Sequence, residues 1–545
     1  MDDQVLQQLP RIAFAVALVG ILSMITRLYE VMIWRPKRLR GKLLKQGISG
    51  PPPSIILGNL PEMKRFSSEP QRGEDQVADG EAKIGNRDQD SRVITHNCSS
   101  KVYPFLERWR KEYGFRIRLV LGSLVLITFM PMYDLFQAEM LHVYDLDTLK
   151  EMTMCTSLDL GRPSNLFRKL GPLLGRGVLT SNGTQWAHQR KIIAPELYAD
   201  KVKGMISLMV QSSMTLVKSW VDMMDRSEGG AADIKIDAFM RSFSGDVISR
   251  ACFGSSFCEG EQIFVKLREP STLRHNYLCV TIIRQLPTKS NRAIWRLEKE
   301  VWSLILKVVK EREGAKSEKD LLQMILDGAK DGHLSSNEMD RFIVDNCKNI
   351  YQAGYETTAV VASWTLMLLA SNSDWQAKVR EEIYQVCAGQ PPNSATIRNM
   401  KTEQMTMVIH KSLRLYPPVA IFSREAQQDI KFGDVLVPKG VTVWAPVATL
   451  HINPDIWGPN AALFCPERFS NGVSASCRHP HVYMPFGVGP RICLGQNLAM
   501  AELKVVLSII LSNFAFSLSP SYNHSPVMRL VIEPEHGINL LVKKL

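Results

Sequence analysis

The most constraining feature of this chain is the segment 486–495, Phe-Gly-Val-Gly-Pro-Arg-Ile-Cys-Leu-Gly. Its three glycines permit backbone geometries and close approaches that side chains forbid, and Pro490 stiffens the loop. Such a loop can direct backbone N–H groups at the sulfur of Cys493. The apolar stretch 494–514 predicts a helix, and the N-terminus of that helix would stabilise a thiolate. The spacing differs from that of a Gly-x-Gly-x-x-Gly dinucleotide loop, and N–H groups directed at a sulfur can tune a metal thiolate.

The remaining composition narrows the kind of partner. The ten cysteines of the 545 residues are scattered, with no Cys-x-x-Cys pair, which is typical of reduced thiols in a large chain. The net charge of +12 fits a nucleic acid, a membrane surface or an acidic protein. The sequence has no zinc-finger spacing and no long Lys/Arg block, so nucleic acid is the weakest of these three interpretations.

A second candidate for chemistry lies in a helix that the periodicity predicts over residues 341–370. Its middle reads Ala-Gly-Tyr-Glu-Thr-Thr over residues 353–358, and glycine and paired threonines are poor helix formers. Gly354 can open space beside a cofactor. The hydroxyl of Thr357 can bond back to a carbonyl, and the adjacent Glu356 can relay protons. Taken alone, this segment favours a kinked structural helix.

Together, the two segments closely resemble motifs of the cytochrome P-450 family. The first resembles the family's haem-binding loop, Phe-x-x-Gly-x-Arg-x-Cys-x-Gly, and the second its oxygen-activating motif, Ala/Gly-Gly-x-Asp/Glu-Thr-Thr/Ser. The resemblance implies that Cys493 is the axial ligand of a haem b iron. Thr357, with Glu356, would deliver protons during oxygen activation. Because a thiolate ligand favours O–O cleavage, the implied reaction inserts one oxygen atom from O2 into an apolar substrate.

Other positions fit the same haem. Phe486 can cover one face of a flat ring, and Arg491 can pair with a carboxylate. Trp186 and Arg190 lie four residues apart, on one helical face, in a pattern that the family uses to hold a haem propionate. Arg424 matches a family position near the propionates less firmly.

The sequence departs from the family at one position. The family places a glutamate three residues before an arginine on one helix, and the pair locks to the arginine of a Pro-Glu-Arg-Phe segment. Here Arg414 and Arg468 are present, but Lys411 occupies the glutamate position, and Glu403 is too far along the helix to replace it. Leaving buried charges unpaired costs ~3–5 kcal/mol. The alternative function is therefore a haem-binding protein of the same fold with impaired or no turnover.

The predicted fold is mainly α with a small β region near residues 420–450, in one large haem-thiolate monooxygenase domain over residues 101–545. Residues 1–34 are predicted to be a luminal tail and transmembrane anchor, because 12–25 are apolar and basic residues follow. Residues 35–66 form a basic, proline-rich linker, and 67–100 a polar flexible insertion. The positive flank places the catalytic domain in the cytosol, on a single-pass endoplasmic reticulum protein.

Several stretches, among them 179–196 and 535–538, resemble plant microsomal enzymes that oxidise gibberellins and related diterpenoid acids. The resemblance implies NADPH–cytochrome P-450 reductase as the electron donor. A basic face, including Arg478 and Lys504, would suit its acidic flavodoxin-like surface. A haem-thiolate isomerase or dehydratase is a further alternative, although Thr357 and Glu356 argue against it.

Overall fold

The computed structural model describes residues 3–54, 58–68, 96–114, 116–121, 138–164, 171, 174–227, 229–254, 263, 266, 288–313, 320–331, 335–400 and 404–545. Helices dominate this part of the chain and small sheets accompany them, so the predicted mainly α class is confirmed. Most of the predicted insertion 67–100 lies outside the described residues. The described cysteines are all free, as expected for reduced thiols.

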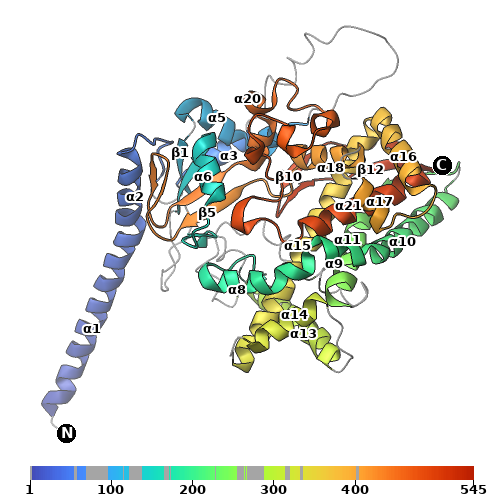
Figure 1. Ribbon diagram of the computed structural model, residues 1–545. Helices are drawn as coiled ribbons and strands as arrows, with labels where there is room; N and C mark the ends of the chain where they lie inside the picture. Colours follow the sequence, from blue (N-terminus) through green and yellow to red (C-terminus); the bar gives the residue numbers. More distant parts are fainter. Residues whose placement is uncertain are drawn as a thin grey trace.

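The N-terminal helix projects from the body of the molecule (Figure 1). Helix α1 (Asp3–Tyr29) continues through a π-helical turn, η1 (Glu30–Trp34), into α2 (Arg35–Leu44). Within the described ranges, no helix combines the length and the apolar character needed to cross a bilayer. The transmembrane anchor therefore stays a prediction.

The largest sheet lies next to α2 and brings together strands from both halves of the chain (Figure 1). Its order is β1-β2-β8-β5-β3, with β2 and β8 parallel and the other pairs antiparallel. Its strands are β1 (Arg116–Leu121), β2 (Ala138–Val143), β3 (Leu160–Gly161), β5 (Phe422–Ala426) and β8 (Thr442–Ala445). A separate hairpin joins β6 (Ile430–Phe432) and β7 (Val435–Val437). These strands confirm the β region expected near 420–450.

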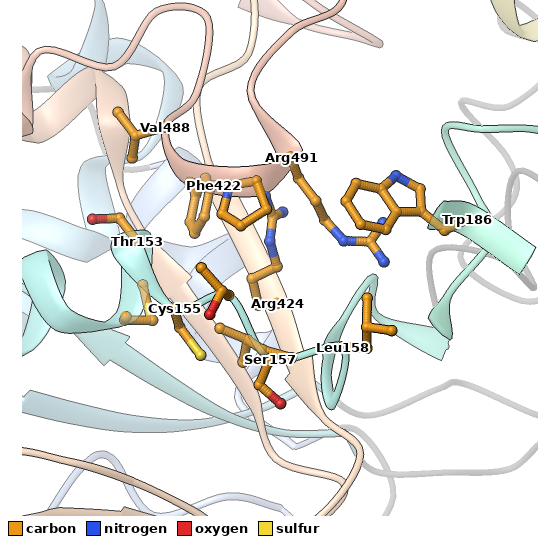
Figure 2. A pocket seen from close by; sticks show the side chains of 13 residues that line it. Thr153, Cys155, Ser157, Leu158, Trp186, Phe422, Arg424, Val488 and Arg491 are labelled. Carbon is orange, nitrogen blue, oxygen red and sulfur yellow. The ribbon is translucent and has the colours of Figure 1, made fainter. Parts of the chain in front are cut away.

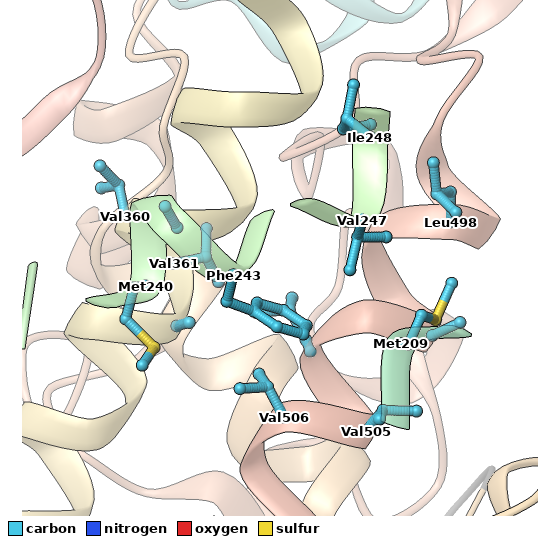
Figure 3. Packing of buried hydrophobic residues seen from close by; sticks show 14 of the residues in the cluster. Met209, Met240, Phe243, Val247, Ile248, Val360, Val361, Leu498, Val505 and Val506 are labelled. Carbon is cyan, nitrogen blue, oxygen red and sulfur yellow. The ribbon is translucent and has the colours of Figure 1, made fainter. Parts of the chain in front are cut away.

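The helical body surrounds one long helix, α15 (Ser336–Ala370). It begins five residues before the predicted start, because Ser335 and Glu338 form a reciprocal capping box. Figure 3 shows the apolar packing of α10, α11, α15 and α21, which contribute Met209, Phe243, Val361 and Val505 to one buried cluster. The other helices before α15 are α3 (Leu60–Ser68), α4 (Cys98–Val102), α5 (Pro104–Tyr113), α6 (Leu146–Met154), α8 (Gly183–Ile193), α9 (Ala199–Gly204), α10 (Ile206–Asp225), α11 (Asp237–Phe253), α13 (Lys289–Glu313) and α14 (Leu321–Asp331).

After α15, short elements alternate with loops until the last long helix. These elements are α16 (Ser373–Cys387), α17 (Ser394–Asn399), α18 (Gln404–Leu415), α19 (Val447–Ile452), α20 (Pro454–Trp457), the 3-10 turns η5 (Pro466–Phe469), η6 (Val473–Ala475), η7 (Pro480–Val482) and η8 (Gly489–Arg491), and α21 (Gln496–Asn513). A further 3-10 turn, η2 (Ala194–Leu197), follows α8.

The C-terminal strands were not predicted from the sequence. They are β9 (Phe514–Leu518), β10 (Pro526–Met528), β11 (Ile532–Pro534) and β12 (Asn539–Lys544), and β12 pairs on both sides, with β9 and with β4 (Ala231–Lys235). Strands this short carry little alternation, and their partners are distant in sequence, so tertiary pairing decides them.

Candidate functional site

The backbone of the cysteine loop has the geometry that its glycines suggested. Gly487 and Gly489 have positive φ angles of 70° and 72°, and a Cβ at Gly489 would lie 2.1 Å from the carbonyl oxygen of Thr153. The N–H of Cys493 donates to the carbonyl of Phe486 at 2.8 Å. Helix α21 begins at Gln496, two residues later than predicted, so Cys493 lies just before the helix rather than inside its first turn.

The electrostatic environment of Cys493 contains opposing influences. Solvent reaches the side chain, although protein atoms surround it closely. Burial raises the pKa of the Cys493 thiol, while a hydrogen bond from the backbone N–H of Gly495 and the cations of Arg190 and Arg162 act to lower it. A metal cation at the sulfur would favour the thiolate much more strongly, because a coordinating thiol is deprotonated.

Four arginines gather around this loop, and we call them the loop arginines: Arg162, Arg190, Arg424 and Arg491. The guanidinium of Arg491 lies 3.9 Å from the ring centroid of Trp186, and it donates to the carbonyl of Ser181 at 3.2 Å. Figure 2 shows Arg424, Arg491 and Trp186 lining the same pocket. Three of the four were predicted from the sequence, namely Arg190 on α8, Arg424 on β5 and Arg491 in the loop itself.

The loop arginines repel one another. Burial lowers the pKa of Arg491 to about 9, helped by Arg162 and Arg190. The pKa of Arg424 is also well below its usual range, because of burial and the cations of Arg162 and Arg491. In the part of the chain that the structure describes, no carboxylate forms an ion pair with any of the four.

This arrangement fits the haem that the sequence implied. A haem carries two propionate carboxylates, and buried cations without a carboxylate partner require anions of this kind. The Nε of Arg162 is buried and has no hydrogen-bond partner among the described residues. Arg190 is held next to the thiol, because its guanidinium donates a hydrogen bond to the carbonyl of Ile492 at 2.9 Å.

Arg162 was missed in the sequence. It follows β3, and the pairing of Leu160 with Ala426 and of Gly161 with Glu425 brings it beside β5, where Arg424 lies. A two-residue strand has no detectable periodicity, so the sequence carried no signal for this neighbour.

The predicted proton-delivery residues lie together on α15. The hydroxyl of Thr357 donates to the carbonyl of Ala353 at 2.7 Å, as expected. Glu356 is buried and pairs with Nε of Arg241 at 3.3 Å, and Arg241 also pairs with Glu533 at 2.8 Å. Glu356 is therefore held in a buried ionic network, which the sequence did not indicate.

The role expected for Gly354 was wrong. A Cβ at this position would lie 2.2 Å from Cδ1 of Ile248 on α11. The missing side chain thus allows α11 to pack closely against α15, and it does not leave space for a cofactor.

The departure at Lys411 has a clear structural consequence. Lys411 and Arg414 are completely buried on α18, and η5, which carries Arg468, packs against this helix. We call these three residues the Lys411 cluster. Burial, with Arg414 as the largest charged contribution, lowers the pKa of Lys411 to about 6. Glu403 lies outside the described residues.

Comparisons with known proteins agree with this site. Residues 129–542 match the model of the family described as Cytochrome P450. The chain is 45% identical over 522 residues to cytochrome P450 714C2 of Oryza sativa subsp. japonica, covering 94% of this chain and 95% of that one. It is 42% identical over 544 residues to cytochrome P450 714A2 of Arabidopsis thaliana, covering 97% and 98%. The chain therefore belongs to the cytochrome P450 family.

Proposed function

We propose that this cytochrome P450 inserts one oxygen atom from O2 into a gibberellin or a related diterpenoid acid. The reaction class follows from the family, whose members are monooxygenases with a cysteine-ligated haem and NADPH-derived electrons from a reductase. The observation that carries the assignment of the site is the position of Cys493 in a glycine-shaped loop, surrounded by the loop arginines.

Each site residue has a defined part in this proposal. When bound through Cys493, haem supplies the oxygen-activating chemistry. The loop arginines would hold its carboxylates, and Trp186 lies against the guanidinium of Arg491. Phe486 packs at the edge of the main core, from where it would contact the ring.

Proton delivery falls to Glu356 and Thr357. The carboxylate of Glu356 accepts a hydrogen bond from Nε of Arg241, which holds it in position beside Thr357 on α15. Thr357 passes the proton on through its Oγ after leaving the carbonyl of Ala353.

The substrate class rests on sequence resemblance. Segments 179–196 and 535–538 resemble plant microsomal enzymes that oxidise gibberellins. The relatives in rice and Arabidopsis, which are plants, support the same branch. Because small changes in a pocket redirect such enzymes, the substrate is the part of the proposal that most needs a direct assay.

We also propose that the N-terminus anchors the protein to the endoplasmic reticulum membrane. Large apolar side chains along α1 are exposed, with Phe14 at 71%, Val19 at 66% and Leu22 at 55%. Exposed apolar surface of this extent is typical of a membrane contact. The basic residues of α2 follow directly, which suits a cytosolic catalytic domain.

The first test is the carbon-monoxide difference spectrum of the reduced protein in yeast microsomes. We expect the red-shifted Soret band of a haem thiolate, followed by reductase-dependent hydroxylation or epoxidation of gibberellin-type acids. A normal band without turnover of these acids would overturn the substrate class alone. A band without thiolate character would favour the alternative, a haem-binding protein with impaired turnover because of Lys411.

Proton delivery is tested by Thr357→Ala. We expect product formed per NADPH to fall about tenfold or more while NADPH consumption continues. The matched control is Thr365→Ala on the same helix, because Thr365 makes the same type of bond, to the carbonyl of Val361 at 2.7 Å. Equal losses in the two variants would show that the effect is structural.

A further inference from the structure

Three buried nitrogen atoms of the Lys411 cluster lack hydrogen-bond partners among the described residues. They are Nζ of Lys411, Nε of Arg414 and Nε of Arg468. Lys411 and Arg414 are completely buried, and Arg468 is half-buried. Unsatisfied buried donors are rare in folded proteins, and three in one cluster indicate a missing acceptor.

Arg414 and Arg468 share one aromatic ring, and Lys411 lies close enough to feel the charge of both. The guanidinium carbons of Arg414 and Arg468 lie 4.7 Å and 5.9 Å from the ring centroid of Trp457. The terminal nitrogens of Arg414 donate to the carbonyls of His451 and Ala461. Arg414 is therefore fixed in place, and among its nitrogens only Nε has no hydrogen-bond partner in the described residues.

The chain supplies little negative charge to this cluster. Glu467 attracts Lys411, but it is exposed and contributes less than the repulsion from Arg414 and Arg468. Cys465 is the other group that acts in this direction. Because no described residue supplies an acceptor for the three donors, an anion from solution or a water molecule is left to complete them.

We propose that the Lys411 cluster is a binding site for a small inorganic anion or one-carbon carboxylate, such as chloride or formate. A single negative charge among the three donors satisfies each of them and offsets their mutual repulsion, which water does not. The closed surroundings of Lys411 and Arg414 restrict the occupant to a small ion. An anion in contact with the ammonium would also raise the lowered pKa of Lys411. This site is independent of the substrate proposed above.

The test uses the full-length, haem-loaded protein. Sodium gluconate is replaced by sodium chloride at constant ionic strength, and the midpoint of thermal unfolding is measured. We expect the midpoint to rise and to saturate with chloride, and formate to have the same effect. The variant Lys411→Glu, which places a carboxylate in the cluster, is expected to lose this response.

Two further variants keep the test decisive. Lys310→Glu, at an exposed position on α13, makes the same change of charge and should retain the chloride response. Lys411→Met removes one donor and should raise the chloride concentration at half-saturation about tenfold. An unsaturated response, or one of equal size in wild type and Lys411→Glu, would show that water fills the cluster and would overturn the proposal.

Discussion

The loop arginines and the Lys411 cluster are both groups of buried cations without a carboxylate ion pair in the described part of the chain, yet their surroundings differ. Arg424 and Arg491 line a pocket near the Cys493 thiol, and Arg190 and Arg491 are held by backbone carbonyls. In the Lys411 cluster, Lys411 and Arg414 are completely buried, and three nitrogens have no acceptor among the described residues.

The difference shows that buried cations without a carboxylate partner can arise for two different reasons. Around Cys493 the missing anion belongs to a ligand, so the cations are positioned in advance for its carboxylates. In the Lys411 cluster, the family pattern provides the anion as a glutamate side chain, and one substitution has removed it. The first group is built for binding, whereas the second carries a cost in stability.

The largest expected effect separates the two groups completely. Cys493→Ser should abolish the haem-thiolate spectrum and all turnover, because the axial ligand is lost. The chloride response of the Lys411 cluster should persist in this variant. The reduced carbon-monoxide spectrum and thermal unfolding measure the two effects. A retained thiolate band would exclude Cys493 as the ligand.

Restoring the family's glutamate at position 411 should remove the loss of stability that the Lys411 cluster causes. Lys411→Glu should raise the free energy of unfolding by ~3–5 kcal/mol, because it gives the cations of Arg414 and Arg468 a buried carboxylate partner. Equilibrium denaturation by urea in gluconate buffer measures this change. Lys310→Glu serves as the surface control, and a gain of the same size in that variant would contradict the assignment.

The Lys411 cluster should also make stability depend on pH. The folded pKa of Lys411 is about 6 and its ordinary value is 10.5, so between these values the unfolded chain binds a proton that the folded chain does not. The free energy of unfolding should therefore fall as pH falls, by about 4 kcal/mol between about pH 9 and pH 6.

This dependence is measured in gluconate buffer against Lys411→Met. The variant removes the titrating amine but keeps Arg414, Arg468, Glu467 and Cys465, which act on Lys411. An identical pH dependence in the two proteins would assign the effect to other groups.

The smallest effect concerns the loop arginines. Arg190→Leu should weaken haem retention about tenfold, because one charge-assisted hydrogen bond to a carboxylate is lost. Lys191→Leu, on the exposed face of the same helix, should leave retention unchanged. Transfer of haem to excess apomyoglobin measures the rate of loss. Equal rates in both variants would place Arg190 outside the haem contacts.

Much of the site could be predicted because its signals are local. The glycine pattern of the cysteine loop requires positive φ angles at Gly487 and Gly489, and the structure has them. The back-bond of Thr357 and the end of α5 at Gly114 also follow from neighbours within four residues. Local rules of this kind need no knowledge of the rest of the chain.

Other features depend on contacts between distant segments. Arg162 joins the loop arginines through the pairing of β3 with β5, and Glu356 is bound by Arg241 and Glu533 from distant parts of the sequence. Gly354 is required by Ile248 of α11, not by a cofactor. No periodicity within one segment could have identified these partners.

The sequence by itself determined the thiolate loop, the long helix with its Thr-containing turn, the family and the substitution at Lys411, because each is encoded in consecutive residues. Only the tertiary structure decided which charges lie together, where they are buried and which donors have no acceptor. The physical reason is that the free energy of a charge depends on its distance to other charges and on its removal from water, and both are set by how the chain packs.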